Sequence, residues 1–398
     1  MKRRQASLRE QAARHHGLMN RYDFFLITLF LFLIGLGLIM VASTSMTVAD
    51  RVHSDPFYFF WRQFIAVLIG LGCGVLVVKI PLTFWQTLSV YLLVIAVVLL
   101  VLVLIPGIGK EVNGSMRWIN LGPANLQGSE VAKLFTLMYL AGYLVRHGEK
   151  VCTTFSGFIR PIGVVTLVAG LLLLEPDYGA AVVLFATTLG MLFVGGVPLS
   201  RFFAWVSVAT VALFSLAVLS PYRMQRLVSF LDPWQDPFNS GFQLTQALIA
   251  FGRGEWFGVG LGSSIQKLFY LPEAHTDFVF AVYAEEFGLV GVTVLILMFF
   301  FIVWRAFVIA QVAQQEGKLF SAYLAYGIGL LIGLQAFINI GVNMGVLPTK
   351  GLTLPLISYG NNSMIISCVL IALLIRIEYE NRNPSFHEAG GSVPDYAL

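Results

Sequence analysis

Long uninterrupted runs of apolar residues occupy most of this chain. Phe24–Ala42, Trp85–Ile105 and Phe278–Val303 are each close to the ~20 residues that an α-helix needs to cross a bilayer, or longer. Charged residues make up 12% of the 398 residues, whereas soluble domains carry about 25%. A membrane β-barrel would alternate in segments of about ten residues, and continuous apolar runs argue against it. The sequence therefore predicts an all-α polytopic membrane protein.

The apolar runs predict about ten transmembrane helices. The clear runs are Phe24–Ala42, Phe64–Val78, Trp85–Ile105, Ile162–Leu174, Ala180–Val197, Phe202–Leu219, Phe278–Val303 and Ala322–Val342. Two more, Val131–Val145 and Met364–Ile375, are shorter than the ~20 residues of a span, so we expect each to extend into its polar flanks. An even number of spans places both termini on the same side of the membrane.

The basic residues give the orientation. With the N-terminus inside, 15 of the 25 lysines and arginines lie in cytoplasmic segments, in agreement with the positive-inside rule. Both termini are therefore predicted to be cytoplasmic, as polar tails of residues 1–21 and 380–398 that flank a membrane domain of residues 22–379. The net charge of +4 follows from this topology and does not indicate a nucleic-acid partner.

A polar, aromatic and glycine-rich segment from Tyr222 to Asp277 interrupts the apolar sequence. The topology makes it a large extracytoplasmic loop, about residues 221–277, between the seventh and eighth helices. A loop of this length is usually either functional or disordered, and its content of Trp, Phe, Tyr and Leu argues against disorder. Its glycines follow no predicted strand, so we interpret them as tight turns and not as a nucleotide-binding loop. The segment is expected to be a folded functional element.

Ionisable residues at membrane depth are costly to bury and are usually functional. Glu130 and Lys133 open the fourth span at i, i+3 spacing, which makes them neighbours on one helix face. They form either a mutually neutralising structural pair or a pair that faces the substrate. The residues alone leave both alternatives open.

Two consecutive glutamates, Glu285 and Glu286, lie inside the eighth span. Their separations from Asp277 put them about 80° and about 180° around the helix from that residue. At most one of them can share the face of the aspartate. We expect that one to be a partner of Lys133 or Arg117.

Asp277 stands at the predicted mouth of the eighth span. It is either a helix N-terminal carboxylate stabilised by the macrodipole or a general base at the boundary between membrane and water. Periodicity leaves these two alternatives open. The spacing of the cysteines does not resemble a metal site, and no metal site is predicted.

Ordered motifs along nearly the whole chain resemble the SEDS family (shape, elongation, division and sporulation proteins). They are Val-Asn-Gly-Ser-Met-Arg-Trp-Ile at 112–119, Ser-Glu-Val-Ala-Lys at 129–133, Glu-Pro-Asp-Tyr-Gly at 175–179, Pro-Tyr-Arg-Met-Gln-Arg-Leu at 221–227, Leu-Pro-Glu-Ala-His-Thr-Asp-Phe at 271–278, Ala-Glu-Glu-Phe-Gly at 284–288 and Leu-Pro-Thr-Lys-Gly-Leu-Thr-Leu-Pro-Leu-Ile-Ser-Tyr-Gly at 347–360. Thr349 and Lys350 are similar to the cell-division branch, whereas the elongation branch usually has an apolar pair there. Two places depart from the family pattern: Gly128 stands where proline is usual, and Asn361 and Asn362 replace small residues.

The resemblance implies a peptidoglycan glycosyltransferase that polymerises lipid II into glycan strands at the outer face of the inner membrane during septal cell-wall synthesis. Asp277 matches the family's essential aspartate and would be the general base for the acceptor hydroxyl. Cations should stabilise the charge of the leaving pyrophosphate. The residues expected to bind substrate are Arg117, Glu130, Lys133, Arg223, Gln243, His275, Glu285 and Lys350.

The resemblance also implies partners. These are lipid II, glycan linked to undecaprenyl pyrophosphate, the class B penicillin-binding transpeptidase FtsI, other divisome proteins and the lipids of the bacterial inner membrane at the division septum. The sequence requires no cofactor, although a divalent cation such as Mg²⁺ or Mn²⁺ could neutralise the pyrophosphate.

Two alternative functions belong to other classes. A lipid II flippase would use the ionisable residues of the spans as a polar path for the head group. A division scaffold would recruit a transpeptidase without chemistry of its own. The large outer loop favours the enzyme, because a flippase does not need a fixed base beside a folded external element.

Overall fold

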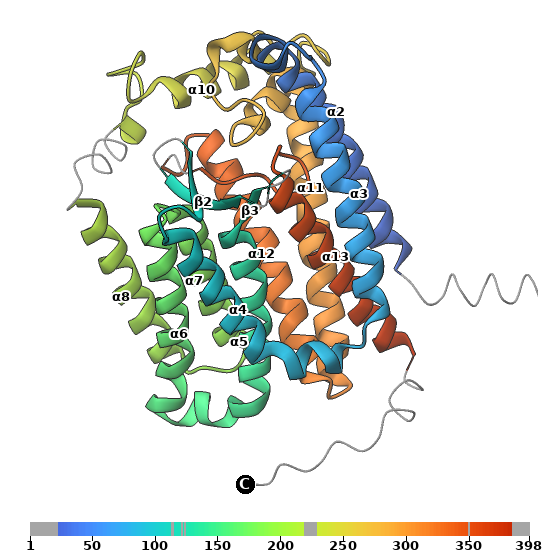
Figure 1. The fold of residues 1–398 in the computed structure, drawn as a ribbon, viewed down its shortest axis with the longest axis vertical. Coiled ribbons are helices and arrows are strands. Elements are labelled where there is room, and N and C mark those ends of the chain that lie inside the picture. The colour runs from blue at the N-terminus through green and yellow to red at the C-terminus, as the bar shows by residue number, and fades with distance from the viewer. Residues whose placement is uncertain are drawn as a thin grey trace, which may run out of the picture.

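The computed structural model describes residues 23–112, 115–120, 122, 125–218, 229–348 and 351–383. Long helices pack side by side into a bundle, and a short sheet and a helical cap lie towards one end of it (Figure 1). The helices are α2 (Phe24–His53), α3 (Tyr58–Lys79), α4 (Leu82–Leu104), α5 (Gly128–Thr153), α6 (Phe155–Leu174), α7 (Tyr178–Val194), α8 (Leu199–Val218), α10 (Phe242–Gly254), α11 (Val279–Gln315), α12 (Leu319–Asn343) and α13 (Asn361–Arg382), with a π-helical turn η1 at Gln266–Tyr270.

Each predicted apolar run corresponds to one of these helices, with its ends shifted by a few residues in most cases. The two short runs extend into their polar flanks as expected, because α5 begins at Gly128 and α13 continues to Arg382. The first helix differs most from its run. α2 begins after the N-cap Asp23, whose carboxylate accepts the Leu26 N–H, and it continues about three turns beyond Ala42 to His53.

Seven helices of the described residues are long and apolar enough to cross a membrane, namely α2, α3, α4, α6, α11, α12 and α13. α7 and the first half of α8 are shorter apolar helices. Many large apolar side chains on α3, α4 and α11 are exposed, which suits a surface that faces lipid. The chain is therefore a multi-pass helical membrane protein.

The beginning of α2 and the end of α13 lie at the same end of the bundle. The guanidinium of Arg305 on α11 pairs with the Asp23 carboxylate and, at 3.0 Å, with the Glu378 carboxylate. Figure 1 shows this end at the bottom of the bundle, opposite the cap that contains α10. The described ends of the chain therefore lie on one side.

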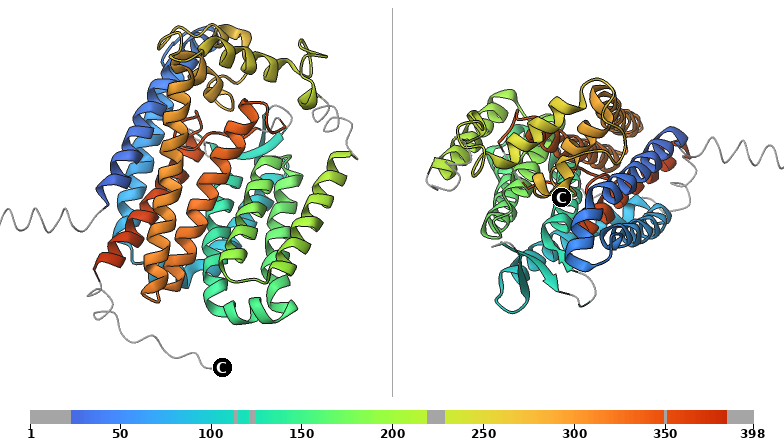
Figure 2. Two further views of the ribbon diagram at one scale, coloured as in Figure 1. Left: turned by 180° about the vertical axis from the view of Figure 1, so that it is seen from behind. Right: turned by 90° about the horizontal axis from the view of Figure 1, so that it is seen from above.

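The all-α prediction is wrong for the connection between α4 and α5. An antiparallel sheet of β1 (Gly109–Val112), β2 (Ser115–Asn120) and β3 (Asn125–Gln127) forms there, in the order β1-β2-β3. Trp118 in the central strand pairs with Lys110 on one side and Gln127 on the other. Strands of three to six residues are too short to stand out beside long apolar runs. Seen from above, the sheet lies at the rim of the bundle (Figure 2).

The described part of the large loop, residues 229–278, is folded as predicted. It contains α10 and η1, which contact each other, and it covers one end of the bundle (Figure 2). Gly258, Gly260 and Gly262 have positive φ angles of 80°, 98° and 80°, which confirms their interpretation as turn residues. Two calls lie outside the described residues: Arg223 and Lys350. The tail of residues 1–21 and most of the C-terminal tail lie outside them as well.

Candidate active site

Asp277 lies immediately before α11, at the end of the bundle that the cap covers. Its backbone carbonyl accepts hydrogen bonds from the side-chain amides of Asn339 and Asn343, each at 2.9 Å. Its carboxylate is partly exposed and lies against Gly351, where a Cβ atom would come within 3.1 Å of Oδ2. The backbone of the aspartate is thus fixed by α12, and the glycine leaves room for its carboxylate.

Three amide side chains form a ladder on one face of α12. Gln335, Asn339 and Asn343 are four residues apart and buried, so they share one face of the helix. Besides Asp277, the ladder binds the segment that follows the helix, since Gln335 donates to the Thr353 carbonyl at 3.1 Å and Asn339 to the Leu352 carbonyl. The sequence interpretation missed these residues. The signal was present as amides at four-residue spacing in an otherwise apolar span.

Asn343→Leu is expected to destabilise the protein by about 1–3 kcal/mol and to lower its activity, because it removes a donor from the Asp277 carbonyl and an acceptor from the buried Ala281 N–H. Thermal unfolding and activity of the purified protein measure this. Gln311→Leu, at an exposed amide on α11, is the matched control and should leave both near wild type. Equal behaviour of the two variants would contradict a supporting role for the ladder.

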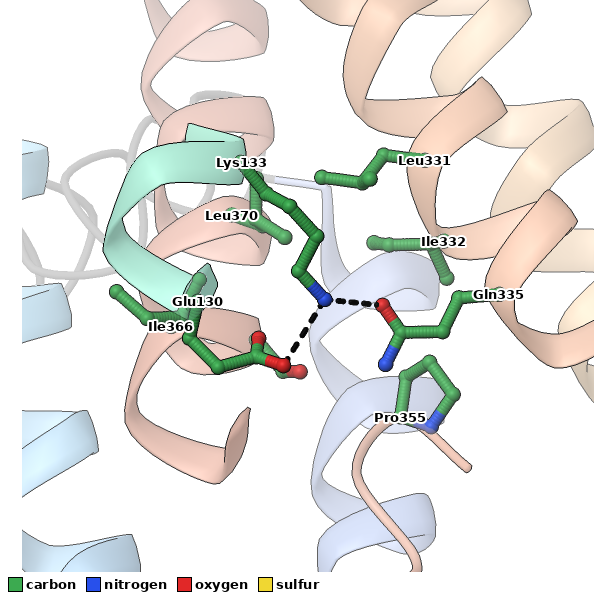
Figure 3. A pocket seen from close by; sticks show the side chains of 9 residues that line it. Glu130, Lys133, Leu331, Ile332, Gln335, Pro355, Ile366 and Leu370 are labelled. Atoms are coloured by element: carbon green, nitrogen blue, oxygen red, sulfur yellow. Dashed lines mark hydrogen bonds and ion pairs between the residues drawn. The ribbon is translucent and has the colours of Figure 1, made fainter. Parts of the chain in front are cut away.

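Glu130 and Lys133 form the expected pair on α5. Lys133 Nζ lies 2.9 Å from Glu130 Oε1 and 2.9 Å from Gln335 Oε1 of the ladder (Figure 3). Both residues are buried, and Lys133 is only 1% exposed. With Pro355 and apolar residues of α12 and α13 they line a small pocket that has room for at most about one water. Because Gln335 also binds Thr353, the ladder connects this pair to the segment beside Asp277.

Arg117 in β2 contacts the turn between α6 and α7. Its guanidinium donates to the backbone carbonyls of Glu175, at 3.3 Å, and Pro176, at 2.6 Å. The Glu175 side chain in this turn is fully buried, and its two oxygens have no hydrogen-bond partner among the described residues. Burial and the nearby Asp177 carboxylate raise the pKa of Glu175 from 4.5 to about 8, and Arg117 opposes this rise. The carboxyl group is therefore mostly protonated at neutral pH.

The raised pKa predicts a pH-dependent stability. An unfolded Glu175 ionises near its ordinary pKa of 4.5 and the folded one near 8, so the folded state loses stability as pH rises between these values. Glu175→Gln removes this titration. The variant should unfold at a higher temperature than wild type at pH 8 and above, and at a similar temperature near pH 4.5. A parallel pH dependence of the two proteins would show that Glu175 does not titrate in this window.

His275 lies in the outer segment between two aromatic rings. Its ring centroid is 4.8 Å from that of Phe59 and 5.7 Å from that of Tyr359, and its carbonyl accepts the Tyr359 N–H at 2.9 Å. Burial lowers the pKa of His275, although the Glu273 carboxylate opposes this. The imidazole is therefore neutral at pH 7 and holds the outer segment against the segment before α13.

The expected partners of the two consecutive glutamates are wrong. The Glu285 carboxylate accepts from Arg253 at 2.7 Å, from the Ser264 hydroxyl and from the N–H groups of Ile265 and Gln266. Both glutamates are buried, and neither pairs with Lys133 or Arg117. These partners come from the folded loop, which a helical wheel cannot show.

The second glutamate, Glu286, accepts from Lys267 at 2.8 Å and from the hydroxyl of Ser43 on α2 at 2.9 Å. Lys267 also donates to Ser43 at 2.9 Å, and both ion-paired side chains are buried. Glu285 and Glu286 therefore hold the outer loop to α11 and α2.

The structure brings together only part of the predicted site. The α12 ladder joins Asp277 to Glu130 and Lys133, whereas Glu285 belongs to the anchored loop. Gln243 is half-buried on α10, a helix that packs over the end of α12. Asn362 at the start of α13 donates to the Asn125 carbonyl of β3 at 2.8 Å, so this departure from the family pattern ties α13 to the sheet.

Known proteins resemble the chain over most of its length. The cell cycle protein family of FtsW, RodA and SpoVE matches residues 24–383. The proteins named "Probable peptidoglycan glycosyltransferase FtsW" of Thioalkalivibrio sulfidiphilus and Nitrosococcus halophilus are both 57% identical to it, over 91% of this chain and 91% and 93% of their own lengths.

Solved structures agree. A chain of a peptidoglycan synthase complex that coordinates polymerization and crosslinking superposes with a TM-score of 0.74 and 30% identity, over 90% of this chain and 98% of that one. The rod shape determining protein RodA of Thermus thermophilus gives a TM-score of 0.68 and 28% identity, over 90% and 97% of the two chains. The resemblance of the motifs to SEDS proteins is thereby confirmed, and the chain belongs to the FtsW/RodA/SpoVE family of cell cycle proteins.

Proposed function

We propose that this protein is a peptidoglycan glycosyltransferase that polymerises lipid II into glycan strands during septal wall synthesis. The observation that carries the proposal is a partly exposed carboxylate, Asp277, on a backbone fixed by two buried amides at the capped end of the bundle. A general base must be held in place and still be reachable by substrate, and Asp277 meets both conditions. Relatives with this name at 57% identity support the substrate class.

The reaction uses Asp277 as the base. The 4-hydroxyl of the GlcNAc in an incoming lipid II attacks C1 of the MurNAc at the reducing end of the growing strand, and the carboxylate takes the hydroxyl proton. A bond forms between C1 and O4 while the bond from C1 to the phosphate oxygen breaks, with inversion at C1. Undecaprenyl pyrophosphate leaves with the electron pair. Because pyrophosphate is already a good leaving group, no second carboxylate has to protonate it.

Cationic side chains near the outer surface would stabilise the leaving pyrophosphate. Arg117, Arg223 and Lys350 are our candidates, and Lys350 precedes the Gly351 that lies against Asp277. Gln243 and His275 would shape the space for the sugars. For Glu130, Lys133 and Glu285 a structural role is the simpler proposal, because their charges are paired inside the protein. A divalent cation on the pyrophosphate would belong to the substrate.

The membrane arrangement follows from the same proposal. We place ten spans, α2 to α8 and α11 to α13, with both termini in the cytoplasm and the loop of about 221–277 outside. Asp277 then lies at the outer face of the bacterial inner membrane, where lipid II is polymerised. The solved synthase complex supports a crosslinking partner, which we take to be the class B penicillin-binding transpeptidase FtsI together with other divisome proteins at the septum.

Reconstitution tests this function against the flippase and the scaffold. The protein and its transpeptidase, with the crosslinking active site blocked, are placed in sealed vesicles that carry labelled lipid II in both leaflets. We expect glycan strands to form from lipid II exposed on the side of the outer loop, without faster exchange of lipid II between leaflets. Exchange without strands would support a flippase, and neither activity in a correctly assembled complex would support a scaffold.

A further inference from the structure

α11 is interrupted near its beginning. Gly288 has φ 64° and ψ −165°, which breaks the helix between a buried first segment, residues 279–287, and the long remainder. In a regular helix the N–H groups of Leu289 and Val290 would bond to the carbonyls of Glu285 and Glu286. Here these four groups need other partners, because lipid supplies none.

The loop of residues 255–260 supplies those partners. Leu289 and Val290 donate to the carbonyls of Glu255 and Trp256, at 2.9 and 3.1 Å. The carbonyls of Glu285 and Glu286 accept from the N–H groups of Val259 and Gly260, at 2.9 and 3.1 Å. Four bonds to the loop therefore replace two bonds of the helix. A Cβ at Gly288 would come within 2.4 Å of the Gly258 nitrogen, so only glycine permits this contact.

The break lies one membrane thickness from the opposite end of the bundle. α2 and α11 are linked at one level by Asp23 and Arg305, and at another level by Ser43 and Glu286. The two levels are separated by about 20 helical residues on each helix, or about 30 Å. This equals the hydrocarbon thickness of a bilayer, about 30 Å. Gly288 and the loop bonded to it therefore lie at the outer boundary of the hydrocarbon.

The loop presents large apolar rings at this level. Trp256 is 65% exposed and Phe257 is 82% exposed. Leu289 and Val290, whose N–H groups bond to the loop, are also exposed and begin the outward row of apolar side chains on α11. The rings thus continue the surface of α11 that faces lipid. Tryptophan is enriched at the boundary of membranes, where its ring is apolar and its N–H reaches water.

We propose that Trp256 and Phe257 insert into the outer leaflet of the membrane, between the head groups and the ends of the acyl chains. The occupant of this surface is membrane lipid, because the surface is continuous with the lipid-facing side of α11. The insertion holds the 255–260 loop against Gly288. The loop in turn fixes the buried segment 279–287, which begins directly after Asp277 and Phe278. This inference depends on the membrane arrangement and not on the reaction that Asp277 performs.

Depth measurement with a nitroxide spin label tests the proposal. The label is placed on Phe257→Cys in a Cys73→Ala and Cys152→Ala background, in which the remaining Cys368 is buried. Phe300→Cys, on the exposed side of α11, and Phe238→Cys, 84% exposed in the outer loop, are the references. In lipid vesicles the label at 257 should be reached by oxygen and shielded from a water-soluble nickel chelate, as at 300. Nickel exposure at 257 equal to that at 238 would overturn the proposal.

Two further measurements cover a perturbing label and a protein partner. The emission lost in Trp256→Phe should be quenched by lipids brominated near the head-group end of their chains, and unquenched emission would contradict insertion. A photo-crosslinking amino acid at 257 in cell membranes should yield little protein adduct. A dominant protein adduct at 257 would assign this surface to a protein partner and overturn the lipid assignment.

Discussion

Asp277→Asn is expected to lower the rate of lipid II polymerisation by at least about 10²-fold, the contribution typical of a positioned general base. Asparagine keeps the size of the side chain but cannot accept the hydroxyl proton. The backbone carbonyl of residue 277 keeps its bonds to Asn339 and Asn343, so the fold should be unchanged. The initial rate with labelled lipid II, in the presence of the transpeptidase partner, measures the loss.

Glu111→Gln is the matched control for this variant. Glu111 is an exposed carboxylate in β1, and its neutralisation should leave the rate near wild type. Both variants should unfold at the wild-type temperature and bind the partner equally. If Asp277→Asn polymerised lipid II as fast as the control, Asp277 would not be the base.

Lys133→Met is expected to destabilise the protein by about 3–5 kcal/mol, the usual loss when one partner of a buried ion pair is removed. Lys133 is 1% exposed, and its loss would leave the buried Glu130 carboxylate without its cation. It would also release Gln335 from one of its two contacts. A large drop in the unfolding temperature in detergent would show this effect.

A double variant separates the two interpretations of this pair. Glu130→Gln with Lys133→Met removes both charges, so it should recover most of the lost stability. We expect polymerisation to return with it, because both contacts of Lys133 lie inside the protein. A double variant that is stable but still inactive would instead assign Lys133 to substrate binding. If the double variant were as unstable as the single one, the ion pair would not explain the loss.

The helices were predictable because each depends on a local signal. A run of apolar residues identifies a buried or lipid-facing helix wherever it packs, and α5 and α13 extended into polar flanks because their partners bury those flanks. The sheet of β1 to β3 was missed, since its strands have three to six residues. The break at Gly288 could not be read from a continuous apolar run, because its partners come from residues 255–260.

The candidate site was predictable to a similar degree. The i, i+3 spacing of Glu130 and Lys133 fixed their contact, and the motif around Asp277 directed attention to the right end of the bundle. The partners of Glu285 were not predictable, because they lie 19 to 32 residues away in a loop whose fold has no periodic signal. The amides of α12 were readable by spacing, but only the structure shows that they bind the Asp277 carbonyl.

One measurement tests the central claim most directly. Wild type and Asp277→Asn, each with a transpeptidase partner whose crosslinking site is blocked, receive the same lipid II, and both products are followed in one reaction. We predict that wild type forms glycan bonds and releases undecaprenyl pyrophosphate in equal amounts, whereas the variant forms about one-hundredth or less of either. Equal yields of both products from the two proteins would contradict the account.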